Sequence, residues 1–279
     1  MRFCVSTKDL LWGAALASFC AGAALMPVLA ADTSIPSLMA ANYAYGWTSM
    51  GGEWTMLPDS GQTTVQDPNV KYVPNNVAEQ PTFRYANANN PNLMQWASDE
   101  LKKDNARQDR GFAMWSRSAR CWAQGVPVFL INPARPTYFI QTPKEVLMIS
   151  ETDHQVRHVY LNVPHSANPK PSWYGESVGR YEGNELVIDT IGQNTKTFID
   201  NFRTPHSEKL HVIEHYKLTD GGKTLQVTFR VEDPDTFYQP WSATAKLRRV
   251  QMPMHEEACA ENNRNVFDYQ IPVAGKADF

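Results

Sequence analysis

The feature that most constrains this fold is a run of short extended segments joined by tight turns in the second half of the chain. Five segments have strand character: 177–182, 185–191, 210–218, 224–232 and 243–250. The first two are separated by Gly183-Asn184, residues that tolerate the positive φ angles of a primed hairpin turn. Consecutive hairpins of this length are typical of an antiparallel up-and-down β-barrel or of a sandwich, and such a barrel can hold one small ligand.

The first thirty residues have the composition of a secretory signal peptide. Arg2 and Lys8 give a positive start, 10–25 is an apolar run rich in Ala and Leu, and small residues surround the Ala30–Ala31 bond. We expect cleavage before Ala31 or Asp32, and hence a periplasmic or secreted protein without a stable membrane anchor. The alternative is an uncleaved transmembrane anchor, for which the apolar run is short.

Two cysteines remain after removal of the signal peptide, Cys121 and Cys259. In an oxidising exported compartment such a pair is expected to form a disulfide. The bridge would close a very long loop, for which the chain-entropy model gives roughly 4–5 kcal/mol of stabilisation. Neither cysteine has a histidine beside it at the spacing of zinc ligands, so the pair does not indicate a zinc site.

Charge and motifs exclude several classes of function. The chain has 26 Lys and Arg against 29 Asp and Glu, with no basic run, which argues against nucleic acid as a partner. It lacks a P-loop, a Gly-x-Gly-x-x-Gly turn after a strand and a His-Glu-x-x-His pair. We therefore expect no cofactor and no catalytic metal. The partner that remains is a small-molecule ligand or substrate.

The chain before the hairpins divides into two regions. We expect an irregular N-terminal wrap over 31–110, and one antiparallel barrel domain over 111–279. Inside the wrap, Asn90-Pro91 predicts the start of a helix over 91–107, because Asn can cap a helix and Pro suits its first turn. One apolar face of this helix is formed by Leu93, Ala97 and Leu101. We expect the helix to cover a sheet or to close one end of the barrel.

Strand alternation places Glu214 on the inner face of the predicted barrel. It belongs to an otherwise apolar row of segment 210–218, while His211, His215 and Lys217 belong to the opposite, solvent-facing row. A carboxylate in an apolar row costs several kcal/mol unless it is paired or protonated. We therefore interpret Glu214 either as a structural salt-bridge partner or as a catalytic acid or base.

A second carboxylate comes from the Gly183-Asn184 hairpin. A two-residue turn places Val178 opposite Asp189 and Arg180 opposite Val187, so Arg180 and Asp189 become diagonal neighbours on one face. If this face lined a cavity, Asp189 held by Arg180 would be a site for acid–base chemistry or anion binding. If it faced water, the two side chains would form an ordinary surface pair of small energetic value.

The remaining candidates come from loops and from the same inner rows. His206 precedes an inner-face strand, at a barrel rim where binding residues often lie, and Arg157 shares a face with Val159 and Leu161. The candidate catalytic residues are thus Glu214, Asp189 and His206. The candidate substrate-binding residues are Arg157, Arg180, Tyr216 and Trp173.

Several motifs occur together in a distinctive order between Cys121 and Arg264. They are the hairpin Ser177–Thr190, the segment His206–His211 with Glu214, Asp233-Pro234 with Pro240-Trp241, and Cys259–Asn263. This combination resembles a group of exported bacterial lipocalin-like β-barrel proteins of unassigned function. This chain has Tyr181, Asn184 and His215 where that group often has Trp, Asp and Arg. The resemblance implies a lipocalin-like barrel and an exported location, and it carries no catalytic assignment.

We therefore predict an all-β, lipocalin-like (calycin-like) up-and-down barrel with an irregular N-terminal segment and one covering helix. One hypothesis for its function is a cofactor-independent lyase, isomerase or hydrolase, which uses carboxylate and His groups on a small apolar or aromatic molecule. The alternative is a non-catalytic binding protein for a small hydrophobic ligand. The inward carboxylates favour the enzyme, whereas the lack of a known catalytic motif favours the binding protein.

Overall fold

The computed structural model describes residues 46–49, 55–56, 86–110, 121–131, 136–200, 202–250 and 254–259. The predicted signal peptide and its cleavage site lie outside these ranges. Within them, no helix is long and apolar enough to cross a membrane.

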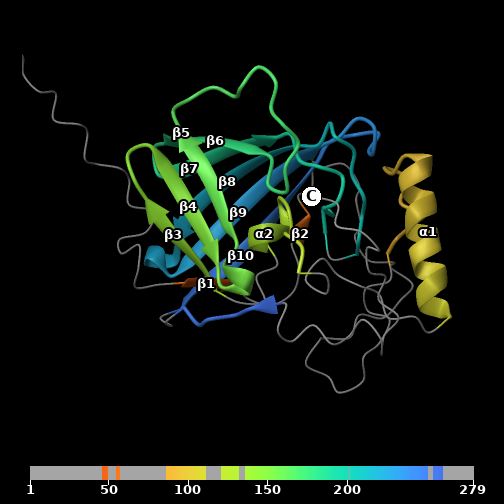
Figure 1. Ribbon diagram of the computed structural model, residues 1–279, viewed down its shortest axis with the longest axis horizontal. Coiled ribbons are helices and arrows are strands. Elements are labelled where there is room, and N and C mark those ends of the chain that lie inside the picture. Colours follow the sequence, from red (N-terminus) through yellow and green to blue (C-terminus); the bar gives the residue numbers. More distant parts are fainter. Residues whose placement is uncertain are drawn as a thin grey trace, which may run out of the picture. The chain divides into compact units, whose positions relative to one another are not determined.

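The described residues are mostly β-structure, arranged in one curled sheet (Figure 1). Its ten strands are β1 (Gly46–Ser49), β2 (Thr55–Met56), β3 (Thr137–Gln141), β4 (Glu145–Ser150), β5 (Val156–Leu161), β6 (Glu176–Glu182), β7 (Glu185–Ile191), β8 (His211–Thr219), β9 (Thr224–Glu232) and β10 (Trp241–Val250). The helices are α1 (Gln95–Asp109), α2 (Val128–Ile131) and two single 3₁₀ turns, η2 (Thr152–His154) and η3 (Asp220–Gly222).

Strands β3 to β10 follow one another across the sheet in chain order and curl into a half-barrel. β1 pairs with β10 along its length and with β3 at one position, and β2 also pairs with β10. Two short strands from the region that we expected to be an irregular wrap therefore belong to the sheet. The pairing of β1 with both β3 and β10 joins the two edges of the half-barrel.

One strand pair corrects the predicted all-antiparallel order. β5 and β6 run parallel, with Val159 opposite Ser177 and Leu161 opposite Gly179. A parallel neighbour requires a long connection that returns the chain to the end where the previous strand began. The segment 162–175 provides this connection. The alternation of side chains along a strand does not depend on the direction in which the strand runs. The pattern therefore could not show that the long segment 162–175 makes β6 parallel to β5.

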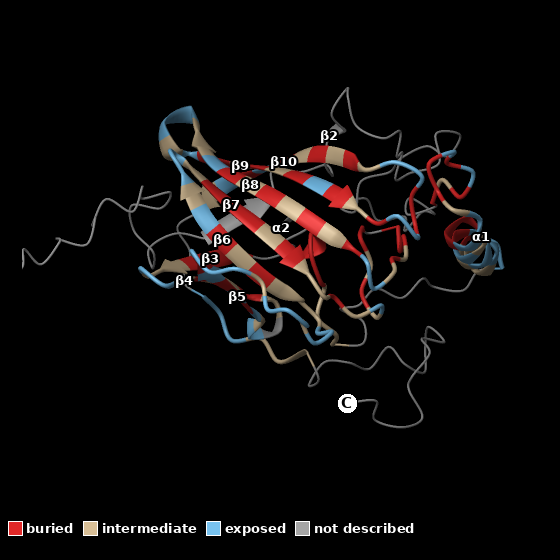
Figure 2. Cartoon of the chain, turned by 90° about the horizontal axis from the view of Figure 1, so that it is seen from above, coloured by how far each residue is buried: buried red, intermediate tan, exposed pale blue. Residues whose placement is uncertain are grey.

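The predicted hairpin register is confirmed between β6 and β7. Val178 lies opposite Asp189 and Arg180 lies opposite Val187, and the turn follows the Glu182–Glu185 pair. Along β5 and β8 buried and more exposed residues alternate, as the banding of the strands in Figure 2 illustrates. The side of each strand that we predicted to face inward is the buried side in both cases.

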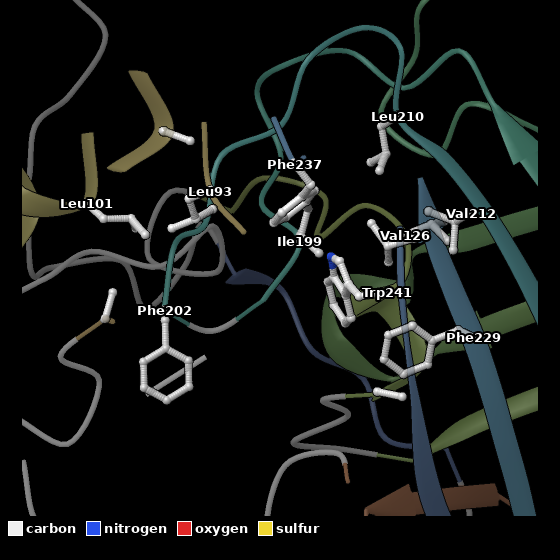
Figure 3. Close-up of a cluster of buried hydrophobic side chains, with 14 of the residues drawn as sticks. Leu93, Leu101, Val126, Ile199, Phe202, Leu210, Val212, Phe229, Phe237 and Trp241 are labelled. Carbon is white, nitrogen blue, oxygen red and sulfur yellow. The ribbon is translucent and has the colours of Figure 1, made fainter. Parts of the chain in front are cut away.

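Two clusters of apolar side chains fill the space inside the sheet and at one of its ends. The first lies inside the sheet and includes Phe139, Met148, Leu186, Tyr216 and Val227. The second joins the sheet to α1 and to the loops between strands (Figure 3). In that view Ile199 and Phe237 lie between Leu93, just before α1, and Trp241 at the start of β10.

Helix α1 begins four residues later than predicted, at Gln95, and ends at Asp109. The helix starts late because the side chains of Asn90 and Asn92 make other hydrogen bonds and do not cap it. The side chain of Asn90 accepts a hydrogen bond from the Asn92 amide, and the Asn92 side chain bonds to the backbone of Gln239. These bonds form a turn that docks on the loop before β10, so the helix starts only after it. The predicted apolar face is buried.

The predicted disulfide is present. Cys121 and Cys259 are bonded across 138 residues of sequence, with their Cα atoms 5.6 Å apart. A second contact holds the short segment 254–259, because the backbone amide of His255 donates to the buried carboxylate of Glu151 at 3.2 Å.

Candidate functional site

Arg157, Glu214 and Tyr216 form a hydrogen-bonded ion-pair network on the inner face of the sheet. The guanidinium of Arg157 donates to both carboxylate oxygens of Glu214, at 3.2 and 2.5 Å. The Tyr216 hydroxyl donates to Oε1 of the same carboxylate at 2.7 Å. Arg157 also donates to the hydroxyls of Ser177 and Thr190, at 3.2 and 2.9 Å. We call these five residues the inner network.

The inner network requires the sheet to be curled. Arg157 lies on β5, Ser177 on β6, Thr190 on β7 and Glu214 on β8. The side chain of Arg157 therefore reaches across the three strands next to its own. In a flat sheet this span would be about 14 Å, given roughly 4.8 Å between strands. The curl brings the inward-pointing side chains closer together than their backbones, and this allows one arginine to contact all three partners.

Burial and neighbouring charges together set the protonation states of Arg157 and Tyr216 in the inner network. Burial is the largest single effect on Arg157 and disfavours its charge, but Glu214 and Tyr216 together outweigh burial and raise the pKa of Arg157 above its ordinary value. Burial, with a further contribution from Glu214, raises the pKa of Tyr216 well above 10. Arg157 therefore stays a cation and Tyr216 stays a neutral hydrogen-bond donor.

The inner network is closed to ligands in this structure. Glu214 and Tyr216 have no exposed surface, and Arg157 is 1% exposed. The polar contacts of Glu214 are those with Arg157 and Tyr216, so both of its oxygens already have donors. The structure thus brings together three of the predicted site residues, and it pairs Glu214 with Arg157 as the structural interpretation required.

Asp189 and Arg180 lie on the outer face of the sheet and do not contact each other. Arg180 is exposed and pairs with Glu182 at 2.6 Å. Asp189 instead accepts contacts from His165 and His211, both at 2.9 Å. The predicted Arg180–Asp189 pair is therefore wrong. The register permits this diagonal contact, but His165 from the 162–175 loop contacts Asp189 instead, and Arg180 pairs with Glu182.

The surroundings of Asp189 contain further charged groups. His165 also contacts Glu176 at 3.0 Å, and His211 lies 3.5 Å from Glu232. The described residues contain no group of three or more His, Cys, Asp or Glu side chains that could hold a metal ion. Sequence reasoning placed His211 on the outer face correctly, but it missed His165, since the fold of a loop leaves no periodic signal.

His206 lies in the loop before β8, as predicted, but it is buried and engaged. Its Nδ1 bonds to the Ser207 carbonyl at 2.8 Å, and its Nε2 lies 2.7 Å from the Thr197 hydroxyl. Ser207 in turn donates to Asp233, through both its amide and its hydroxyl. His206 does not contact Glu214, whose oxygens are held by the inner network, so the three predicted catalytic residues lie at three separate places.

Asp200, in the same region, is a buried carboxylate that sequence reasoning missed. Burial raises its pKa, against the opposing effect of hydrogen bonds from Thr204 and from the Phe202 amide. These donors fold the segment into a compact turn. Asp200 is therefore accounted for by local structure.

Trp173 belongs to a partly exposed aromatic group at one end of the sheet. Its ring lies 5.4 Å from that of Trp122, tilted by 53°, and the ammonium of Lys196 lies 5.7 Å from the Trp173 ring centre. Trp173 precedes β6 and Lys196 follows β7, so both lie where the antiparallel β6–β7 pair has its open end. We call Trp122, Trp173 and Lys196 the indole rim.

Backbone and side-chain hydrogen bonds fix the indole rim in place. Ser172 pairs with the chain at Gly192 and Asn194, next to Trp173 on one side and Lys196 on the other. The Gln193 side chain bonds both the amide and the carbonyl of Val126, at 2.7 and 3.0 Å. The chain around Val126, Ser172 and Gln193 is thus held together by hydrogen bonds. In the sequence, the single signal for Trp122 was its position next to Cys121.

The structure thus presents three separate candidate groups: the closed inner network, an outer charged cluster around Asp189, and the partly exposed indole rim. Comparisons of the chain with protein-family models, with curated proteins and with solved structures find no match. The function is accordingly inferred from these three groups of residues.

Proposed function

We propose that this protein is an exported, non-catalytic binding protein that holds a small, flat aromatic molecule at the indole rim. The observation that carries the proposal is the pair of partly exposed indoles, Trp122 and Trp173, tilted against each other at 5.4 Å. Aromatic faces of this kind contribute large contact area and prefer offset or edge-to-face partners. The disulfide supports the exported location, since such bonds persist in oxidising compartments.

The rigidity of the indole rim also supports binding. Its segments are joined by the Ser172 pairing, by the Gln193–Val126 bonds and by the nearby Cys121–Cys259 bridge. A ligand that meets a fixed surface loses less free energy to the ordering of protein groups than one that must organise a mobile loop. We propose that the protein resembles a lipocalin in two respects: its sheet is curled, and it holds a ligand at one end of that sheet.

The contacts of Glu214 argue against an acid–base enzyme. A general acid or base needs a group that can reach the proton of a substrate. Both oxygens of Glu214 are hydrogen-bonded and the side chain has no exposed surface. These observations favour a role for the inner network in holding β5 to β8 together.

The proposal is tested with 2-naphthol as the probe and its saturated counterpart, decahydro-2-naphthol, as the control ligand. We expect 2-naphthol to quench the indole fluorescence of the mature protein saturably, and the non-planar control to bind about three- to tenfold more weakly, the range expected for a stacked aromatic pair. Trp173→Ala should weaken binding of 2-naphthol about tenfold or more. Calorimetry provides the independent measurement of affinity.

Trp96→Ala is the matched control variant, since Trp96 is an exposed indole on α1, bonded to the carbonyl of Asp235 and not part of the rim. We expect it to bind 2-naphthol as the unaltered protein does. Equal binding by Trp173→Ala and the unaltered protein would overturn the proposal, and so would an absence of binding at millimolar probe.

A further inference from the structure

The loop over 162–175 is fastened at two places, to the chain just after β7 and to the outer face of the sheet. Near its far end, Ser172 pairs with the backbone at Gly192 and Asn194. Near its start, His165 contacts Glu176 on β6 and Asp189 on β7. The first attachment consists of peptide groups and is independent of pH, whereas the second consists of titratable side chains.

Both ring nitrogens of His165 contact a carboxylate. Its Nδ1 lies 3.0 Å from Oε1 of Glu176, and its Nε2 lies 2.9 Å from Oδ1 of Asp189. A carboxylate can only accept hydrogen bonds, and a neutral imidazole carries a single N–H. Both contacts can therefore be hydrogen bonds only when the ring is a doubly protonated cation.

His211 adds a second imidazole to the same carboxylate oxygen. Its Nε2 lies 2.9 Å from Oδ1 of Asp189, and its Nδ1 lies 3.5 Å from Oε2 of Glu232. The contact with Asp189 has hydrogen-bond geometry, whereas the contact with Glu232 is an ion-pair distance that is favourable only with a positive charge on the ring. Asp189 is thus held between two histidines, one from the loop and one from β8.

The charges that face this cluster come from the loop and from four strands. They are those of His165, Glu176 on β6, Asp189 on β7, His211 on β8, and Arg230 with Glu232 on β9. With both histidines neutral, the cluster has an excess of two negative charges. With both protonated, it is neutral overall. Hydrogen bonds from Ser166 lower the pKa of Glu176 and keep that carboxylate ionised.

We propose that His165, Asp189 and His211 form a proton-dependent clasp that holds the 162–175 loop against the outer face of the sheet. When both rings are protonated, they bridge the carboxylates and the loop is held closed. When both rings are neutral, each retains one N–H, the negative charges repel one another, and the stretch around His165 opens, while the Asn162 amide stays bonded to the Gly179 carbonyl. The bonds from Ser166 to Glu176 do not depend on a histidine proton, so the release is partial.

The clasp lies on the same loop as Trp173, eight residues before it in the chain. The pH-independent pairing of Ser172 lies between His165 and Trp173, so the indole rim stays in place when the clasp opens. The clasp therefore does not rest on the proposed binding function. The test below accordingly uses the mature protein without any ligand.

The test compares hydrogen–deuterium exchange in the peptide 162–175 between the unaltered protein and His165→Gln, at pH 5.5 and at pH 8. A comparison at one pH removes the intrinsic pH dependence of exchange. We expect the variant to exchange about tenfold faster at pH 5.5, where it lacks the charge-assisted bonds, and within about twofold at pH 8. Asp189→Asn should show the same pattern, because it removes the charge that both rings share.

His158→Gln is the matched control. His158 is also an outer-face histidine, but it contacts one carboxylate, Glu145, through one nitrogen at 3.2 Å, which a neutral ring can satisfy. Its effect on the loop should be the same at both pH values. The clasp is ruled out if His165→Gln changes exchange in the loop by the same factor at pH 5.5 and pH 8, or if His158→Gln reproduces the pH dependence. Failure of 2-naphthol to bind would leave this result unaffected.

Discussion

At the scale of residues, Glu214 and Arg157 show that a buried charge requires a partner of opposite charge and further hydrogen bonds. Each is an ion in an environment where an isolated ion would cost several kcal/mol, and each is satisfied by the other with help from three hydroxyl groups. A buried pair of this kind contributes little net stability compared with apolar side chains of the same volume. It is costly mainly when one partner is removed.

The prediction that follows concerns the free energy of unfolding. Glu214→Leu should destabilise the protein by about 3–5 kcal/mol, because Arg157 is left buried without a counter-charge. Replacing both, as Glu214→Leu with Arg157→Met, should cost clearly less than the sum of the two single changes. Urea unfolding of the four proteins measures this coupling.

The milder change Glu214→Gln serves as the control for shape, since it keeps the side-chain volume while it removes the charge. Additive single and double changes would show that the two side chains do not stabilise each other. If a substrate were found, a loss of turnover of about 100-fold in Glu214→Gln with unchanged stability would favour the enzyme over the binding protein.

At the scale of elements, the β5–β6 contact is unusual because it is parallel and tight. Gly179 on β6 faces inward opposite Leu161, and a Cβ built on it would lie 2.8 Å from Cγ1 of Val159. Real Cβ atoms essentially never approach so closely, so a side chain at this position would force Val159 or its neighbours to shift. The glycine therefore allows β6 to lie beside a β5 that presents branched side chains to the interior.

Gly179→Ala should consequently destabilise the protein by about 1–3 kcal/mol, the usual cost of an overpacked core. Val159→Ala, which removes the obstructing methyl group, should recover part of that loss in the double variant. Gly183→Ala is the matched control at the hairpin turn, where a Cβ meets nothing within 4 Å and the cost comes from its φ of +58° alone. Thermal and urea unfolding measure all four variants. Equal stability of Gly179→Ala and the unaltered protein would contradict the close contact.

At the scale of the whole molecule, the disulfide joins two distant parts of the sequence. Cys121 immediately precedes Trp122 of the indole rim, and Cys259 ends the segment that Glu151 holds through His255. Because the bridge spans 138 residues, it restricts the unfolded chain far more than the folded one. Its contribution therefore belongs to the stability of the molecule rather than to one site.

Reduction of the mature protein should lower its melting temperature, with a loss of roughly 4–5 kcal/mol by the chain-entropy model. The double variant Cys121→Ser with Cys259→Ser should show the same lower melting temperature and should not respond to reductant. A thiol reagent applied to denatured, unreduced protein should find no free cysteine from this pair. Two reactive thiols in that assay would contradict the bridge.

The inner network could be predicted in part, and the limits of that prediction have a physical cause. Alternation along β5 and β8 placed both Arg157 and Glu214 inside, because side chains of a strand alternate strictly between its two faces. Their pairing across three strands depends on the curl of the sheet, which no strand pattern specifies. Strand alternation alone also does not name the cation that pairs with Glu214, and the fold places Arg180 outside, beside Glu182.

The sequence by itself determined what depends on neighbouring residues: the β6–β7 hairpin and its register, the inward position of Glu214, and the apolar face of α1. These follow from turn chemistry and side-chain alternation, which act over a few residues. Tertiary structure alone decided the parallel course of β6, the partners of Asp189 and the meeting of Trp122 with Trp173. Each of these depends on where a long connection returns the chain, and that is set by packing over the whole molecule rather than by local preference.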